Sequence, residues 1–142
     1  MAYDAFLKIK GITGENADGT INIEAFSFGV TEPRSTGGGG GAGRTTFSDI
    51  VITKVVDKTS PQFFAMAVEG LLLPAVQLTF QKVLPAVQGV GATEIGFYKL
   101  SNAHIRSIQF TGNRFGDAFP VEEISFSFQK IEFSVSEQRN PG

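Results

Sequence analysis

The chain has 142 residues, of which 42% are hydrophobic and 18% are charged, a composition typical of one folded domain and unlike that of a disordered chain. We therefore expect a single domain over residues 1–142. The formal net charge of −2 offers no basic surface for phosphate binding, so nucleic acid is not an expected partner. The absence of cysteine excludes disulfides, cysteine nucleophiles and zinc sites built on cysteine.

The sequence contains no segment that we expect to enter a membrane. Its most apolar stretch, residues 71–76, is far shorter than the ~20 residues that a membrane-spanning helix needs. The first residues, MAYDAFLKIK, lack a basic segment followed by an apolar stretch and a cleavage site, so no cleaved signal peptide is expected. We predict a soluble protein with no direct membrane insertion.

Alternating apolar and polar residues predict strands along most of the chain. The first strands are expected at residues 3–9 and 21–30, and the apolar phase changes between Ala25 and Phe26, which indicates a bulge. The same change of phase follows Phe128 in the last strand, so we expect curvature at both places. Further strands are expected at residues 47–56, 76–82, 95–100, 104–110 and 120–135. Seven strands of this kind favour a mainly β fold, either a barrel or a sandwich.

One segment has the pattern of a helix instead. Ser60 is expected to be the N-cap, Pro61 the first helical residue and Gly70 the terminator. Phe64, Ala67 and Val68 are spaced to share one face of this helix. We predict a single short helix over about residues 60–69.

Two segments between strands are expected to be loops. Residues 31–46 contain five consecutive glycines, and a loop of this length inside a small domain is usually functional, so it is expected to order on contact with a partner. Residues 83–93 form the second loop. Within the first, residues 38–45 match a phosphate-binding loop except that Arg44 replaces the lysine. The following residues predict a strand and not the helix that such a loop must open, so we interpret the segment as a loop without nucleotide chemistry.

No residue combination predicts an active site or a cofactor. His104 is the only histidine and shares no recognisable motif with a metal ligand or a nucleophile. Glu122 and Glu123 are neighbours on a strand, so they point to opposite faces and cannot act together on one substrate; we expect them at a solvated edge or a subunit contact. We therefore predict a protein that is not an enzyme, with no catalytic residue, metal ligand or cofactor.

Four lysines are scattered over strand and turn positions, and we expect them to serve solubility. They are Lys8, Lys10, Lys54 and Lys58. Elsewhere, Phe26 and Phe28 flank Ser27 on one strand, so the two rings are expected on one face and the hydroxyl on the other.

Several segments resemble the haemolysin-coregulated protein (Hcp) family, whose members build the tube of the type VI secretion system. They are YDAFLKIKGITGEN at the start, FSFG before the glycine loop, GGGGGAGRTTFSDIVITKVVDKTSP after it, and PVEEISFSFQKIEFSV at the end. The resemblance covers residues 3–135. Departures lie in connections: the turn at residues 15–20 is short, and the segment at residues 83–102 is longer than the hairpin connection usual in the family.

The resemblance implies a small antiparallel β-barrel with one helix, six copies of which close into a ring that stacks into a tube. Implied partners are the spike, sheath and baseplate proteins of the secretion apparatus and effector proteins carried in the lumen. The chain would be in the bacterial cytoplasm during assembly and would then be secreted without a cleaved signal peptide. The lumen and effector-binding candidate is Ser27. The ring-stacking loop would include Thr31, Arg34, Gly37, Gly38, Gly39, Gly40, Gly41, Gly43 and Arg44.

Three functions therefore remain open from the sequence. The favoured one is a structural subunit of the secretion tube that carries effectors. The second is a secreted β-barrel adaptor or a protein like a phage-tail tube subunit, and the third, less favoured, is a nucleotide-binding enzyme that uses the glycine loop and Arg44.

Overall fold

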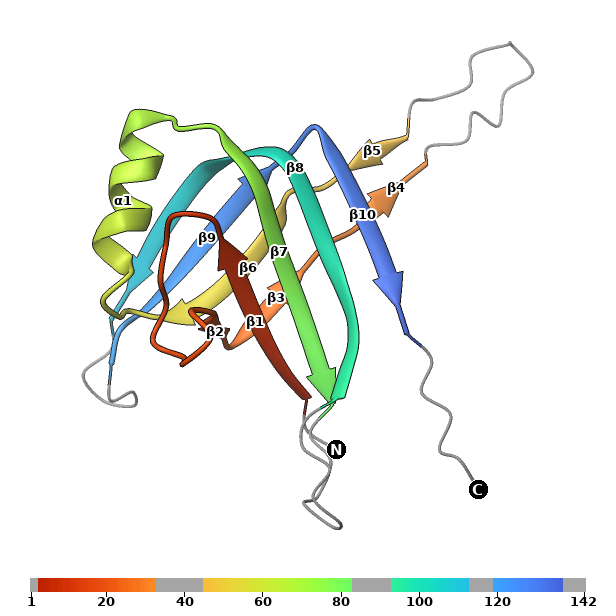
Figure 1. Ribbon diagram of the computed structural model, residues 1–142. Coiled ribbons are helices and arrows are strands. Elements are labelled where there is room, and N and C mark those ends of the chain that lie inside the picture. The colour runs from red at the N-terminus through yellow and green to blue at the C-terminus, as the bar shows by residue number, and fades with distance from the viewer. Residues whose placement is uncertain (1–2, 33–44, 83–92, 113–118, 137–142) are drawn as a thin grey trace, which may run out of the picture.

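The computed structural model describes residues 3–32, 45–82, 93–112 and 119–136 as a mainly β fold with one helix (Figure 1). The glycine-rich residues 33–44 and the predicted loop residues 83–92 lie outside this described part. In chain order the elements are β1 (Tyr3–Ile9), β2 (Ile21–Ile23), β3 (Ala25–Ser27), β4 (Val30–Thr31), β5 (Thr46–Phe47), β6 (Ile50–Val55), α1 (Ser60–Glu69), β7 (Leu73–Lys82), β8 (Thr93–Thr111), β9 (Val121–Ser127) and β10 (Lys130–Val135).

Eight strands form one antiparallel sheet that curls back on itself as a small barrel, and β4 and β5 form a separate two-stranded sheet. The sheet order is β2-β1-β7-β8-β9-β6-β3, and β10 adds to β8. Only Glu24 separates β2 from β3, so a single bent strand pairs with β1 at one end and with β6 at the other. The Glu24 amide donates to the Thr53 carbonyl over 2.8 Å and continues the second pairing. The predicted change of phase in this strand is confirmed, and its structural role is to carry the chain from one half of the barrel to the other.

A second bend lies in β8, which the sequence predicted as two strands. Its first half pairs with β7 and β10, and its second half pairs with β9. The two halves meet at Asn102, whose φ of 52° turns the strand. The Asn102 side-chain amide donates to Gln129 Oε1 over 3.2 Å, and Gln129 is the residue at which β9 gives way to β10. The prediction of two separate strands is therefore wrong, whereas the predicted curvature after Phe128 is confirmed.

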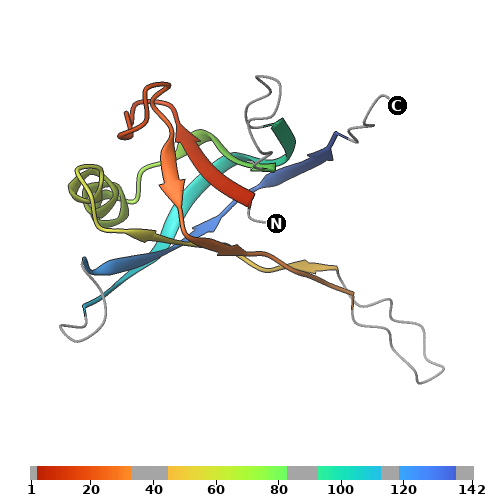
Figure 2. The same ribbon diagram turned by 90° about the horizontal axis from the view of Figure 1, so that it is seen from below.

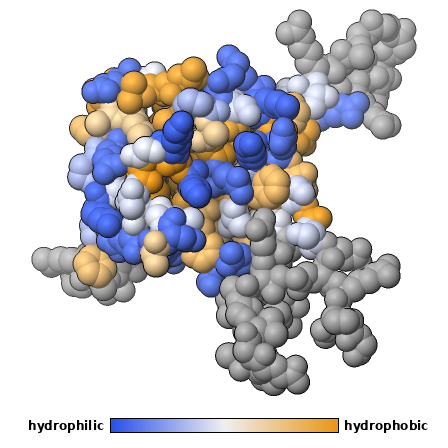
Figure 3. All heavy atoms as spheres, viewed as in Figure 1, coloured by the Kyte–Doolittle hydropathy of each residue, from blue (hydrophilic) through white to orange (hydrophobic). Residues whose placement is uncertain are grey.

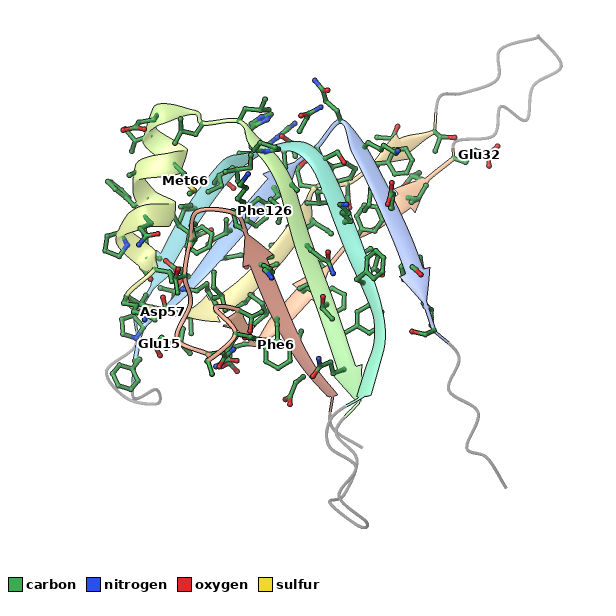
Figure 4. The ribbon with its side chains drawn as sticks, in the orientation of Figure 1. Phe6, Glu15, Glu32, Asp57, Met66 and Phe126 are labelled. Atoms are coloured by element: carbon green, nitrogen blue, oxygen red, sulfur yellow. The ribbon has the colours of Figure 1, made fainter. Side chains whose placement is uncertain are left out.

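Apolar side chains from β1, β2, β6, β7, β8, β9 and α1 make most of the core. Figure 4 shows Phe126 pointing from β9 into the space between the two halves of the sheet. The buried hydrophobic residues are Ala5, Leu7, Ile9, Ile12, Ile21, Ile23, Ile50, Ile52, Phe63, Leu73, Val76, Leu78, Leu100, Ala103, Ile105, Ile124 and Phe126. Those on strands mostly alternate with more exposed residues, as the alternation in the sequence predicted.

The helix packs against the second half of β8 and closes one side of the barrel (Figure 1). It begins with Ser60, and its N-cap is Thr59, so the predicted cap is one residue too late. Pro61 lies in the first turn, where a missing amide proton is tolerated. Gly70 ends the helix with φ of 63°, as predicted, because glycine adopts this left-handed conformation without strain.

Candidate functional site

The outward face of four neighbouring strands, β3, β6, β9 and the second half of β8, carries small and polar residues in register. One row across this face runs from Ser27 to Val51, Ser125 and Ser107. The next row consists of Ala25, Thr53, Glu123 and Gln109. We call these eight residues the polar face. Its members are exposed or half-buried, with no aromatic residue among them.

Ser27 lies on the polar face, and the rings on either side of it point the other way, as predicted. Phe26 and Phe28 are half-buried, and each makes an edge-to-face contact with Tyr98, with centroid distances of 5.9 Å and 5.7 Å. They belong to an aromatic cluster that packs against the core and extends to the surface at Phe47 and Phe133. Its members are Phe26, Phe28, Phe47, Phe80, Tyr98, Phe128 and Phe133. The cluster fixes the strand so that the Ser27 hydroxyl faces outward.

Strands β4 and β5 pair as a ribbon that projects away from the barrel (Figure 2). Its register places Val30 opposite Phe47 and Thr31 opposite Thr46. At its base the Ser48 hydroxyl accepts from the Gly29 amide over 2.8 Å, and the Ser48 amide donates to the Gly29 carbonyl over 2.9 Å. The predicted stacking residue Thr31 is therefore on the ribbon.

The other predicted stacking residues, Arg34, Gly37, Gly38, Gly39, Gly40, Gly41, Gly43 and Arg44, lie outside the described residues. The chain resumes at Thr45 and continues into strand β5, whereas a phosphate-binding loop would open a helix here. The expectation that residues 38–45 are followed by a strand is confirmed. The first helix of the chain after this segment begins at Ser60.

A buried ion pair occupies the helix side of the barrel, where the sequence predicted solvated charges. Lys54 and Glu122 are directly opposite each other on β6 and β9, both side chains are fully buried, and the Lys54 ammonium donates to Glu122 Oε1. The ammonium also lies 3.1 Å from Asp57 Oδ1 and 3.0 Å from the Val55 carbonyl. The expectations of a solubility role for Lys54 and a solvated edge for Glu122 are both wrong.

The physical reason is the alternation of side chains along a strand. Lys54 and Glu122 each lie an even number of residues from the inward-facing apolar residues of their own strand, so they also point inward. Lys54 follows Ile50 and Ile52 in this phase, and Glu122 precedes Ile124. Glu123 is exposed on the opposite face, so the prediction that the two glutamates point apart is confirmed.

The pair also holds the helix. The Ser60 hydroxyl donates to Glu122 Oε1 over 2.8 Å, which ties the first helical residue to β9. Asp57, at the foot of α1 in Figure 4, accepts from the Thr59 amide over 2.8 Å. Partial burial raises the pKa of Asp57, but hydrogen bonds from Thr59 and Lys54 outweigh this and hold the pKa below its usual value of 3.8. Glu122 Oε2 is buried and has no hydrogen-bond partner among the described residues.

His104 has a partner that the sequence did not reveal. Its Nε2 lies 2.8 Å from the Ser127 hydroxyl, across the β8–β9 pairing. A hydrolytic triad needs an acid behind the histidine, and no contact in the described ranges joins an acid to His104. In the same ranges no group of three or more His, Cys, Asp or Glu residues is placed to hold a metal ion. No helix among the described residues is both long and apolar enough to span a membrane.

Comparisons with known proteins point in one direction. The sequence model of a family described as "Type VI secretion system effector, Hcp" matches residues 6–135. Among curated proteins, none matches. Solved structures with the same fold include a type six secretion system protein, at 23% identity and a TM-score of 0.80, with 93% of this chain and 83% of that chain covered. Hcp1 from Salmonella typhimurium is 24% identical with a TM-score of 0.77, covering 95% of this chain and 87% of that one. Hcp3 from Pseudomonas aeruginosa is 20% identical with a TM-score of 0.72, covering 94% and 91%.

Proposed function

The chain belongs to the Hcp family of the type VI secretion system, and we propose that it is a subunit of the secretion tube, in which six copies close into a ring and the rings stack. The tube encloses a lumen that carries effector proteins, and the subunit is secreted through the apparatus that it builds. Its other partners are the spike, the sheath and the baseplate. In this role the chain is structural and catalyses no reaction.

The observation that carries the proposal is the polar face. A lumen through which folded cargo moves must bind weakly along its length, and small hydroxyl and amide side chains provide such a wall. Ser27, Ser107 and Ser125 run in one row across three of its four strands. Large side chains of the same strands, such as Phe26, Ile52 and Phe126, pack in or against the core. Ala25 and Val51 are the apolar members of the polar face, so the wall offers little apolar area that would retain an effector.

The ribbon supports the stacking part of the proposal. It extends beyond the barrel, and its two strands lead into and out of residues 33–44 (Figure 1). A projecting segment of this kind can reach a subunit in the next ring, where the glycines allow close approach of two backbones. We assign this role to Thr31, Arg34, the glycines between residues 37 and 43, and Arg44.

The experiment places Ser27 relative to the ring. The chain has no cysteine, so Ser27→Cys creates a single thiol that can carry a small gold label. The matched control is Lys8→Cys, at an exposed strand position on the other half of the barrel. In electron micrographs of the ring, the label on residue 27 is expected at the centre and the label on residue 8 at the perimeter. A label from residue 27 at the perimeter would exclude the polar face as the lumen wall.

A further inference from the structure

A group of apolar side chains on and beside α1 is exposed, and we call it the helix patch. It consists of Phe64, Val68, Leu71, Leu72 and Phe110, and between 45% and 71% of each side chain is accessible. Figure 3 shows hydrophobic residues gathered at the upper left, over α1 and the segment that follows it. Phe64 and Phe110 lie 6.4 Å apart between ring centroids, so the patch joins the helix to β8. The helix contains a single charged residue, at its last position.

A second exposed apolar group lies at the end of the aromatic cluster, and we call it the aromatic rim. It consists of Val30 and Phe47 on the ribbon and Phe133 and Val135 on β10, each more than half exposed. Phe133 stacks on Tyr98 with a centroid distance of 4.6 Å, so the rim is anchored on rigid strands. Among the described residues strand β10 pairs with β8 alone, so no described strand pairs with its other edge.

A hollow of about 570 Å³ lies beside the rim, between β5 and the start of β10. Phe47, Phe128 and Ile131 supply its apolar lining. Arg106 and Asp49 line its polar side and form an ion pair at 3.1 Å. The rim is therefore the edge of a concave surface.

The two surfaces lie on opposite sides of the barrel. In both Figure 1 and Figure 2, α1 is at the left, and β10 and the ribbon are at the right. One molecule cannot bring them together, but two copies in the same orientation can. A contact between two different surfaces repeats from copy to copy, and it closes a ring when the rotation between successive copies adds up to a full turn.

The size of the two surfaces fits this role. A fully exposed aromatic side chain offers about 150–250 Å² and a Val or Leu side chain less, so the rim exposes roughly 400 Å² and the helix patch roughly 500 Å² of apolar area. A standard protein interface buries about 800 Å² per partner, of which somewhat more than half is apolar. Joining the helix patch to the aromatic rim would therefore supply the apolar share of one standard interface.

We propose that the helix patch of one copy packs on the aromatic rim of the next copy, and that this contact closes the ring. The inference rests on the proposed tube function and adds the two surfaces that meet. In this proposal the helix patch and the aromatic rim each bind a second copy of this chain. A sheath protein on the helix patch or an effector on the rim would be a different occupant, and either would leave the two patches apart in the ring.

Cross-linking tests the contact directly, because the chain has no cysteine of its own. The test variant carries Val68→Cys and Val135→Cys, one on each surface and both exposed. After treatment with a short bismaleimide, we expect a ladder of two to six linked chains on a denaturing gel. Each single variant alone should stay unlinked, because the contact joins unlike surfaces. The pair Val68→Cys and Lys8→Cys is the control and should give no ladder.

Light scattering of the same samples before cross-linking separates the two proposals. A ring mass without a ladder in the double variant would overturn the pairing of helix patch and aromatic rim and leave the tube function standing. Dimers from a single variant would show a symmetric contact and also overturn the pairing. A monomer mass at all concentrations would overturn the ring, and the pairing with it.

Discussion

The buried pair of Lys54 and Glu122 offers the sharpest test of the core. We expect Glu122→Gln to lower the free energy of unfolding by about 3 kcal/mol. Removing one partner of a buried ion pair costs about 3–5 kcal/mol, because the other charge stays buried without compensation. The lower end of this range applies, since the Lys54 ammonium keeps Asp57 at 3.1 Å and the Val55 carbonyl at 3.0 Å.

The measurement is urea unfolding followed by circular dichroism, at one fixed protein concentration because the proposed assembly would stabilise the folded chain. The matched control is Glu123→Gln, the next residue, which is exposed on the opposite face of the same strand. Its effect should stay within about 0.5 kcal/mol. The double variant Lys54→Met with Glu122→Leu should recover the parent stability to within about 1 kcal/mol, because it removes both charges together. Equal, small effects of Glu122→Gln and Glu123→Gln would refute the buried pair.

Two further substitutions test the edge strand and the helix N-terminus. We expect Gly96→Ala to destabilise the chain by about 1–3 kcal/mol, because the added Cβ would lie 2.4 Å from the Ser134 carbonyl oxygen of β10. In the control Gly112→Ala the added Cβ meets no atom closer than 3.8 Å. Equal urea unfolding midpoints for the two variants would contradict this expectation. The lowered pKa of Asp57 stabilises the fold fully above its unfolded pKa near 3.8, and this contribution is lost as the pH falls through the lower folded pKa. Asp57→Asn should therefore be less stable than the parent at about pH 6, and the difference should shrink at about pH 3; a difference that is the same at both pH values would exclude the ionised Asp57.

Much of the fold could be predicted from the sequence because its signals are local. Alternation along each strand marks the inward residues, and the change of phase near Ala25 marks the point where one strand passes between the two halves of the barrel. Gly70 at the end of the helix was equally local, since its conformation depends on its own backbone. The two strands predicted in place of β8 show the limit, because the bend at Asn102 is held by Gln129, 27 residues away.

The sites were less predictable because they depend on pairs that are distant in the sequence. Lys54 and Glu122 are 68 residues apart, and only the register of β6 with β9 brings them together. The sequence did contain a signal. Lys54 and Glu122 each lie in the same alternating phase as the buried apolar residues of their strand, and their charges are opposite in sign. His104 and Ser127 gave no such signal, because each has an ordinary strand context. The helix patch and the aromatic rim could not be predicted, because the alternation of residue types does not say how much of each apolar side chain is exposed.

The central claim is that this chain closes into a six-membered ring, and its solution mass tests that claim most directly. Light scattering of the purified protein, paired with electron micrographs, should give six copies of the 15.2 kDa chain, about 91 kDa, or stacks of that unit, and annular particles. A 15.2 kDa monomer at every concentration, with no annular particles, would contradict the account.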